Sequence, residues 1–380
     1  MTTADEVWAL LRAQVSPRPA AAVPLAEASG RTLRETVFTR EDMPPFDRSA
    51  VDGFAVPMGD ESGTFDIAGE IRAGDAPPGA LSAGCASRIA TGAWVPRDAE
   101  IVMLEDASVD GGRVSFTRRG RNHVRRRGED ARAGDELVRA GTLLSGGPIA
   151  LLAGAGCTRP QVTRTIAAHH IATGNEIVDP SAAPRSGQIR DSNSALVCAW
   201  AQRRGMSVSQ QRIGEDGAAL RLALRDDCDL LLVSGGASVG RHDFTDSVLR
   251  QAGFEILVTK VNARPGKPLI VARRGEQWAF GLPGNPLSHF VCLHVFVDAA
   301  LAAMNGSPEA PVLRRGQVTA AIAGHPRETW WPAGDGAAGL RPLRWASSGD
   351  LTALASADAL VRVPVSGLAA GAQAGFIRSI

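Results

Sequence analysis

Tyrosine is absent from the 380 residues of this chain, and lysine occurs only at positions 260 and 267. The other basic residues are arginine, and acidic and basic residues balance to a formal net charge of +1. That balance argues against a generally basic nucleic-acid binder. The five cysteines are scattered without a Cys-x-x-Cys pair. The sequence therefore predicts neither a zinc framework nor a disulfide scaffold, and it favours a reducing compartment, the cytoplasm.

No signal peptide is predicted, because the first residues do not show a basic segment followed by an apolar one. Instead, Thr3 and Glu6 have the spacing of a capping box, which predicts a helix at the start of the chain. The most apolar stretch, residues 286–304, contains His289, His294 and Asp298. We therefore expect a buried core helix there and no membrane partner.

Strand and helix patterns change along the chain. Short strands with frequent turns in residues 46–136 predict a β-rich domain. Residues 166–305 alternate strands with helices, which predicts a central, doubly wound, mostly parallel α/β domain. Residues 306–380 return to short strands and predict a small β-barrel-like C-terminal domain, and residues 1–45 with 137–165 form an N-terminal or linking domain. The predicted fold class is thus multidomain α/β plus β.

Two glycine-rich turns follow predicted strands of the α/β domain. The first contains Ser234, Gly235, Gly236 and Ser238, and the second contains Pro283, Asn285 and Pro286. Ligands of open α/β sheets bind at the carboxyl ends of the strands, where backbone N–H groups and helix N-termini favour anions. The sequence therefore predicts a phosphate or oxyanion site.

A basic turn between these two glycine turns holds Arg264 and Lys267. In a chain so poor in lysine, Lys267 indicates a use for a compact, mobile ammonium group rather than for the planar fork of arginine. The alternative is a surface lysine in a proline-rich turn.

Three carboxylates lie beside the same turns: Glu176, Asp216 and Asp243. Carboxylates near a phosphate indicate a bridging Mg²⁺, which prefers oxygen ligands. Asp216 has the alternative role of a helix N-cap, and Asp243 that of a solvated turn residue. Their shared position favours a metal site.

The β-rich part carries further motifs, at residues 44–56, 88–93 and 124–130. The last contains an arginine run without interleaved aromatic residues, so nucleic acid is not expected as a partner. A solvated basic face is the alternative for this run.

In order along nearly the whole chain, these motifs resemble the molybdopterin molybdenumtransferase family, the molybdate-insertion enzymes of molybdenum cofactor synthesis that include the E domain of gephyrin. The segments that carry the resemblance are PPFDRSAVDGFAV (44–56), RIATGAWVP (88–96), VRRRGED (124–130), ATGNEIV (172–178), GQIRDSN (187–193), VSGGASVGRHDFT (233–245), RPGKPL (264–269), GLPGNP (281–286) and SSGD (347–350).

The resemblance implies cleavage of adenylylated molybdopterin in the presence of molybdate and Mg²⁺ or a similar divalent ion, with release of AMP. It also implies a four-domain homodimer whose cleft is completed by the partner subunit, and a molybdopterin adenylyltransferase or a molybdoenzyme as a protein partner. The catalytic residues it implies are Asp52, Asp130, Glu176, Asp216, Asp243 and Lys267. The substrate-binding residues it implies are Thr91, Gly92, Ser234, Gly235, Gly236, Ser238, Arg264, Pro283, Asn285 and Pro286.

Three departures from the family pattern bear on activity. Asn175 stands where the family usually has Asp, Arg264 where it usually has Lys, and Phe54 where it often has Tyr. The loss of a charge beside Glu176 keeps open a non-catalytic carrier or scaffold that delivers the cofactor to a molybdoenzyme. The α/β domain alone also resembles molybdopterin adenylyltransferases and competence-damage-type nucleotide hydrolases, which lack the motifs at 44–56 and 124–130.

Overall fold

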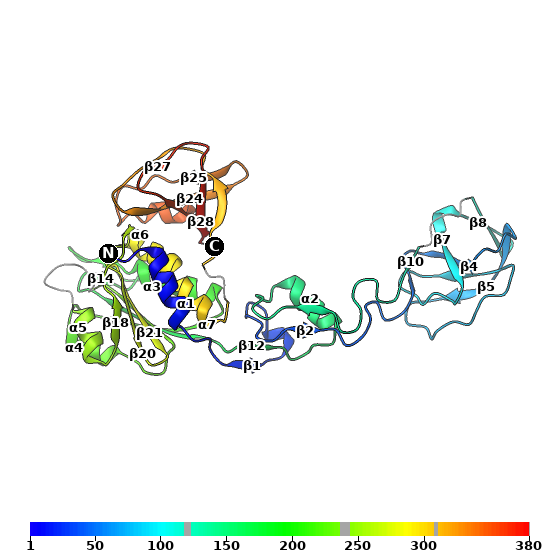
Figure 1. Cartoon of the computed structure of the whole chain (residues 1–380), viewed down its shortest axis with the longest axis horizontal. Helices are drawn as coiled ribbons and strands as arrows, with labels where there is room; N and C mark the ends of the chain where they lie inside the picture. Colours follow the sequence, from blue (N-terminus) through cyan, green and yellow to red (C-terminus); the bar gives the residue numbers. More distant parts are fainter. Residues whose placement is uncertain (118–122, 236–243, 308–310, 380) are drawn as a thin grey trace. The chain divides into compact units, whose positions relative to one another are not determined.

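The computed structural model describes residues 1–117, 123–235, 244–307 and 311–379. The chain divides into two compact units. One comprises Met1–Glu35, Ala140–Ser145 and Arg159–Ile380, and the other comprises Thr36–Arg139 and Gly146–Thr158. Figure 1 labels their elements, and each unit is considered by itself.

The larger unit is built on a six-stranded sheet of order β16-β13-β17-β21-β20-β18. Four neighbouring strands, from β16 to β21, run parallel, and β20 is antiparallel to both of its neighbours. The strands are β13 (Ala167–Thr173), β16 (Ser207–Ile213), β17 (Leu230–Ser234), β18 (Glu255–Val258), β20 (Ile270–Arg274) and β21 (Gln277–Leu282).

Helices cover both faces of this sheet. Along β17, Leu230 and Leu232 pack into one core cluster, whereas Leu231 and Val233 pack into another, because successive side chains of a strand point to opposite faces. Figure 1 shows α4 and α5 on one side and α1, α3 and α7 on the other. The helices are α1 (Ala4–Gln14), α3 (Ser192–Arg203), α4 (Gly217–Ala223), α5 (Thr245–Gln251), α6 (Pro286–Cys292), η3 (a π-helix, Leu293–Val297) and α7 (Asp298–Met304).

Two local predictions for this unit are confirmed: the capping box at the start of the chain and the buried helix near residues 286–304. Thr3 and Glu6 form the capping box of α1. The stretch Pro286–Met304 is the one helix among the described residues that is long and apolar enough to cross a membrane, and 89% of it lies buried inside the protein. Its side chains belong to the main core, as expected. The strand β16, which pairs along its whole length with β13, was not predicted.

A second six-stranded sheet lies near the end of the chain, with order β19-β24-β26-β28-β22 and β25 paired to β24. Its elements are β19 (Ala263–Arg264), β22 (Arg314–Gln317), β24 (Glu328–Gly336), β25 (Gly339–Pro342), η4 (Thr352–Ser356), β26 (Ala359–Val363) and β28 (Gln373–Arg378). Short pairs complete the unit: β1 (Ala20–Ala22) with β12 (Gln161–Thr163), β14 (Ile177–Val178) with β15 (Ile189–Arg190), and β23 (Ile322–Ala323) with β27 (Gly367–Leu368); η1 spans Leu25–Glu27.

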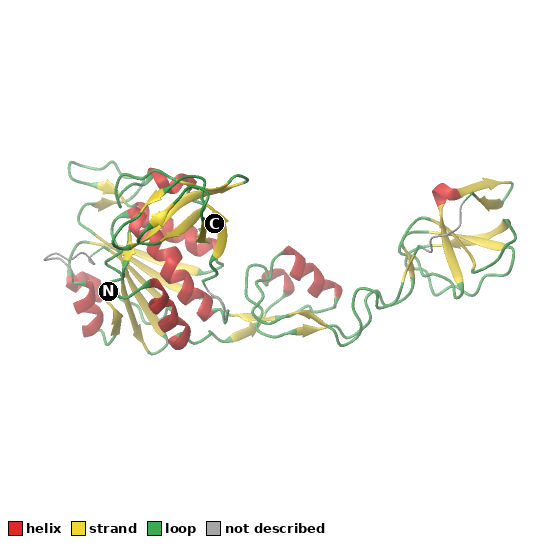
Figure 2. Ribbon diagram, turned by 45° about the horizontal axis from the view of Figure 1, so that its top comes forward, coloured by secondary structure: helices red, strands yellow, loops and turns green. Residues whose placement is uncertain are grey.

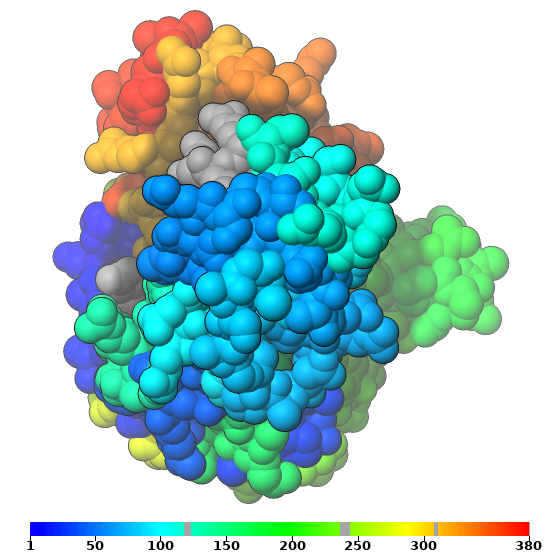
Figure 3. All heavy atoms as spheres, turned by 90° about the vertical axis from the view of Figure 1, so that its right-hand side faces the viewer, coloured from blue at the N-terminus to red at the C-terminus, as the bar shows by residue number. Residues whose placement is uncertain are grey.

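The regular elements of the smaller unit are mainly strands, joined by loops (Figure 2), and its atoms, coloured blue to cyan, pack closely together (Figure 3). Its sheet has the order β7-β4-β6-β5-β9-β8, and two short pairs, β3-β10 and β2-β11, lie outside it. The elements are β2 (Val37–Phe38), β3 (Arg48–Ser49), β4 (Gly53–Pro57), β5 (Thr64–Ile71), β6 (Cys85–Ile89), β7 (Ala99–Met103), η2 (Leu104–Asp106), β8 (Ala107–Asp110), β9 (Arg113–Phe116), β10 (Val124–Arg125), β11 (Glu136–Val138) and α2 (Gly146–Gly154). The fold class predicted from the sequence is confirmed, whereas the four domain boundaries stay a prediction.

Candidate functional site

A cleft of the larger unit lies at the carboxyl ends of its parallel strands. Its volume is about 1190 Å³. Segments that follow β13, β17 and β21 form one wall, and the C-terminal sheet contributes another wall through Arg327, Trp345 and residues 346–349. This is the edge of an open α/β sheet at which ligands bind. The cleft therefore lies where the glycine turns predicted an anion site.

The first glycine turn is held tightly against the strands. Gly235 has φ +86°, and a Cβ at this position would lie 2.5 Å from the carbonyl oxygen of Thr173. Only glycine allows this close approach. The Gly235 N–H donates to the carbonyl of Leu282 at 3.1 Å, so the ends of β13, β17 and β21 meet here. Gly236, Ser238 and Asp243, which the sequence also assigned to the site, lie outside the described residues.

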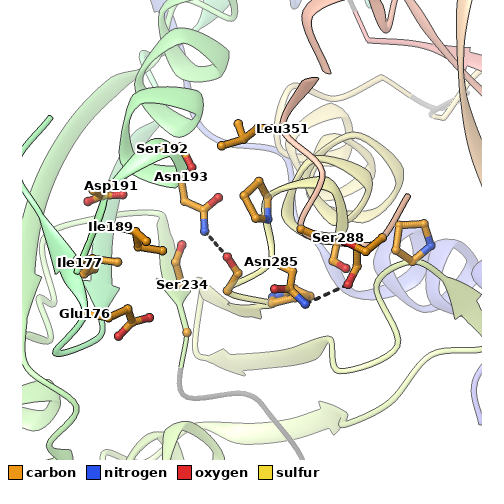
Figure 4. A pocket seen from close by; sticks show the side chains of 18 of the residues that line it. Glu176, Ile177, Ile189, Asp191, Ser192, Asn193, Ser234, Asn285, Ser288 and Leu351 are labelled. Atoms are coloured by element: carbon orange, nitrogen blue, oxygen red, sulfur yellow. Dashed lines mark hydrogen bonds between the residues drawn. The ribbon is translucent and has the colours of Figure 1, made fainter. Parts of the chain in front are cut away.

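The second glycine turn joins β21 to α6, with Pro286 in the first helical turn. Two side-chain bonds fix it (Figure 4): the Asn193 amide donates to the Gly284 carbonyl at 2.7 Å, and the Asn285 amide donates to the Ser348 hydroxyl at 2.9 Å. Pro283, Asn285 and Pro286 all line the cleft, and their role in substrate binding stays a prediction. The turn thus connects three segments that are far apart in the sequence.

Four cations line the same cleft. Arg190 donates to the carbonyl of Pro180 at 3.0 Å, and the other three are Arg264, Lys267 and Arg327. The Arg264 guanidinium lies over the Trp345 ring, 4.8 Å from its centroid. Partial burial and the nearby Arg264 lower the pKa of Arg327. In the part of the chain that the structure describes, no carboxylate forms an ion pair with any of the three. Their positive charge is therefore available to an anion in the cleft.

The basic turn is placed by its contact with α6. Gly266 has φ +113°, and a Cβ there would lie 2.8 Å from the sulfur of Cys292. The glycine lets the turn rest on the helix, and the exposed Lys267 follows it at the edge of the cleft. This local packing explains why a proline-rich turn can present a lysine at a fixed place.

The acidic residues differ in what they contact. Glu176 and Glu215 line the cleft, whereas Asp216 does not. The two oxygens of Asp216 accept N–H bonds from Ala218 and Ala219, at 3.1 and 3.2 Å, so this residue is the N-cap of α4. No group of three or more His, Cys, Asp or Glu side chains within the described residues is arranged to hold a metal ion. The metal role of Glu176, Asp216 and Asp243 stays a prediction.

Two further polar residues of this region, Asn175 and Asp191, form hydrogen bonds that hold neighbouring segments together. Asn175 accepts the backbone N–H of Glu215 at 3.1 Å, and so joins the end of β13 to the turn before α4. Asp191 also lines the cleft, and it caps α3 and pairs with Arg212 at 3.1 Å. Although burial disfavours its ionised form, the bonds from Ser194 and Arg212 lower the pKa of Asp191.

In the smaller unit, Asp52 and Thr91 come together. One oxygen of Asp52 accepts both the backbone N–H of Thr91, at 2.7 Å, and its hydroxyl, at 2.9 Å. These bonds lower the pKa of Asp52, so it is ionised at neutral pH. Gly92 follows with φ +82°. Asp130 forms an ion pair with Arg125. The functional roles of all four predicted residues stay predictions.

Several residues of the cleft were not assigned to the site from the sequence, among them Asn193, Ser348 and Arg327. Asn193 and Ser348 stand inside motifs that were recognised, GQIRDSN and SSGD, but they were not assigned to the site. Arg327 carried no signal at all, because it lies directly before β24, the strand partner of β19, and not in a motif. Only the pairing of β19 with β24 could have revealed it.

Comparisons with known proteins find matches to both the N-terminal part and the α/β part of the chain. Residues 2–156 match the family described as MoeA N-terminal region (domain I and II), and residues 169–303 match the probable molybdopterin binding domain. A molybdopterin molybdenumtransferase from Haemophilus influenzae is 31% identical over 295 residues, which cover 75% of this chain and 73% of the relative. One from Staphylococcus aureus is 30% identical, covering 78% of this chain and 74% of the relative.

Solved structures give the same picture. A molybdopterin biosynthesis MoeA protein from Pyrococcus horikoshii has a TM-score of 0.79 and is 26% identical, and the match covers 100% of this chain and 99% of that one. The likeness thus extends to both units and is not limited to the α/β sheet.

Proposed function

The chain belongs to the molybdopterin molybdenumtransferase family, and from this premise we propose that it transfers molybdenum from molybdate to adenylylated molybdopterin in molybdenum cofactor biosynthesis. The reaction cleaves the phosphoanhydride of the pterin substrate, releases AMP and leaves molybdenum on the dithiolene sulfurs. The observation that carries the proposal is the cleft at the strand ends, in which Arg264, Lys267 and Arg327 have no acidic partner among the described residues.

Each substrate class finds matching chemistry in the cleft. Molybdate and the phosphates of the pterin are oxyanions, and cations with N–H donors are the groups that bind oxyanions. Lys267 and Arg264 would stabilise the negative charge that develops on the bridging oxygen as the phosphoanhydride is cleaved and AMP departs. The glycine turns at Gly235 and Gly284 bring backbone close to the ligand, and Pro283, Asn285 and Pro286 bound the same space.

A divalent ion is the expected cofactor. The available donors near the cleft are carboxylate oxygens, which suit Mg²⁺. We assign its binding to Glu176, Asp216 and Asp243. Asp216 retains acceptor capacity beyond the two N–H bonds it receives, since a carboxylate has about four lone-pair sites. When bound, the ion would neutralise phosphate charge and polarise the bond to be broken.

The proposed active form is a homodimer in the cytoplasm. The family resemblance supports a cleft completed by the partner subunit, with Asp52, Asp130, Thr91 and Gly92 as contributors to substrate binding or catalysis. The five cysteines are all free thiols, which fits a reducing compartment. Upstream, an adenylyl-transferring enzyme must supply the substrate, and downstream a molybdoenzyme must accept the product.

Release of AMP from adenylylated molybdopterin by the purified protein tests the proposal. We expect release that requires both molybdate and Mg²⁺, and that stops when EDTA is added. Tight pterin binding without AMP release under any condition would contradict the transferase and indicate a carrier instead. Release without molybdate would indicate a pyrophosphatase-like hydrolysis rather than metal insertion.

A further inference from the structure

Two buried histidines flank one hydroxyl group at the floor of the cleft. His170 lies on β13, Ser234 ends β17 and His289 lies on α6, and all three are almost fully buried. The Ser234 oxygen is 2.6 Å from Nε2 of His170 and 3.4 Å from Nδ1 of His289. Ser234 is also one of the residues that line the cleft, and Figure 4 shows its side chain among them. The histidines are thus placed to act on a cleft residue from behind.

The proton of His170 can be located from its neighbours. The Gln210 amide nitrogen lies 2.8 Å from the Ser194 carbonyl, which can only accept, so the orientation of this amide is fixed. The same nitrogen lies 3.3 Å from Nδ1 of His170. Since an N–H group faces Nδ1, Nδ1 must be the acceptor and the proton sits on Nε2. His170 therefore donates to the Ser234 oxygen.

The proton of His289 follows in the same way. Its Nδ1 lies 3.2 Å from the Pro283 carbonyl, an acceptor, so Nδ1 carries the proton. Its Nε2 is buried and has no hydrogen-bond partner among the described residues, which suits a bare acceptor better than a donor. The single Nδ1–H then faces both Pro283 and Ser234, and links the second glycine turn to the first.

Both rings are neutral at neutral pH. Burial, the larger cause, and the neighbouring His289, the smaller one, lower the pKa of His170 to about 3. Burial lowers the pKa of His289 to about 4. Asp191 is the charged group that favours protonation of either ring, and it does not overcome burial. The proton positions assigned above therefore hold under working conditions.

The Ser234 oxygen thus faces two N–H donors, and its own proton has no acceptor within the residues that the structure describes. We propose that His170 and His289 are positioning residues that force the Ser234 hydroxyl to donate into the cleft, to an oxygen of a tetrahedral oxyanion. The inference rests on the proposed function for the nature of the ligand. The oxyanion is molybdate or a phosphate of the pterin substrate, which share this chemistry.

Replacing each histidine by asparagine or glutamine tests which ring nitrogen carries the proton, and the substitution expected to retain affinity differs between His170 and His289. Asparagine places its N–H group where the Nδ1–H of histidine stands, and glutamine places it near Nε2–H. His289→Asn and His170→Gln should therefore retain ligand affinity, whereas His289→Gln and His170→Asn should lose it. A hydrogen bond to a charged ligand corresponds to a loss on the order of 10- to 100-fold. A purely structural role would follow side-chain size and thermal stability, not this crossed pattern.

The probe is calorimetric titration of the full chain with molybdate alone and, separately, with adenylylated molybdopterin, alongside the melting temperature of each variant. Ser234→Ala should weaken one of the two ligands on the order of 10- to 100-fold, and the ligand affected identifies the oxyanion. In the double variant Ser234→Ala/His289→Gln, the loss should equal that of Ser234→Ala alone, because His289 acts through Ser234.

Two results would overturn the inference: unchanged affinity of Ser234→Ala for both ligands, or losses at Ser234 and His289 that add in the double variant. Binding is measured here without turnover. A wild-type protein that binds both ligands but releases no AMP would contradict the proposed function, and would leave the role of Ser234 to be decided by the titrations.

Discussion

Charged residues lie at both ends of the parallel strands, but they are ion-paired at the amino end, whereas three cations at the carboxyl end have no carboxylate partner among the described residues. At the amino end, the buried Asp229 lies 2.9 Å from Arg18 and 2.6 Å from Arg164, and Arg18 also pairs with Glu276 at 3.0 Å. At the carboxyl end, Arg264, Lys267 and Arg327 have no carboxylate partner among the described residues. Both ends are hollowed, the amino end by a pocket of about 630 Å³.

The difference shows that a hollow alone does not mark the ligand site. At the amino end each of these charged side chains has an oppositely charged partner. Such buried ion pairs hold the local structure, and they add little to the free energy of unfolding compared with apolar packing. Where like charges gather, the charged form is disfavoured: partial burial first, and the neighbouring Arg264 second, lower the pKa of Arg327, and a bound anion would offset both effects. We therefore assign the ligand site to the end at which Arg264, Lys267 and Arg327 have no carboxylate partner among the described residues.

The amino end should respond through stability. Asp229→Ala leaves Arg18, 3% exposed, without its nearest carboxylate, and should lower the free energy of unfolding by about 3–5 kcal/mol. Urea denaturation followed by tryptophan fluorescence measures this, since Trp278 lies in the adjoining core. AMP release per folded molecule should stay unchanged. Loss of turnover in a stable variant would place function at this end too.

The same residue makes a pH prediction. Burial disfavours its ionised form, but the bonds from Arg164 and Ala167 lower the pKa of Asp229 below its ordinary value of 3.8. A carboxylate with a lowered pKa stabilises the fold above its ordinary pKa, and this stabilisation is lost as the pH falls through the folded value. The stability difference between wild type and Asp229→Ala should therefore shrink below about pH 4.

The carboxyl end should respond through activity. Lys267→Ala removes a cation that stabilises shifting negative charge, so AMP release should fall about 100- to 1000-fold while the melting temperature stays the same. Lys260→Ala is the matched control, because it removes the only other lysine, also exposed, from outside the cleft. A fully active Lys267→Ala variant would remove the oxyanion role of this residue.

Substitutions of Asp216 should affect both stability and activity, because its carboxylate caps α4 and is also assigned to the metal ion. Asp216→Ala should lower the free energy of unfolding by about 1 kcal/mol through the lost cap. Asp216→Asn keeps an acceptor for the helix N–H groups and should retain that stability, yet need more Mg²⁺ for AMP release. If Asp216→Asn shows the wild-type Mg²⁺ dependence, the residue is a cap and nothing more.

How far the sequence could foresee the site depends on where its residues stand. Ser234, Gly235 and Pro283 lie at or directly after the ends of buried strands, so local pattern predicted that they share one sheet edge, and Lys267 was added because its basic turn lies between the two glycine turns in the sequence. Arg327 reaches the same cleft only through pairing of β24 with β19, which no local pattern encodes.

The fold shows the same limit. Thr3, Asp216 and the apolar stretch 286–304 carry local signals, and the helices they predicted are present. The strand β16 was missed because its side chains are mostly exposed and polar, and what holds it is backbone pairing with β13. The histidine pair behind Ser234 was likewise invisible, since its contacts join residues 55 and 64 positions apart.

Substitution of Asn175 by Asp should give the smallest change in stability and activity, and it separates the structural role of this residue from a role in metal binding. Its amide oxygen accepts the Glu215 N–H, and a carboxylate oxygen of Asn175→Asp can do the same, so stability should not change. Asn175→Leu, the control, loses the bond and should lower the free energy of unfolding by about 1 kcal/mol. The added charge beside Glu176 should leave AMP release unchanged or raise it at limiting Mg²⁺, because a divalent ion gains an oxygen ligand. A large loss of activity in a stable Asn175→Asp protein would mean that this position is adapted to a different ligand, and that the carboxyl end is tuned away from further negative charge.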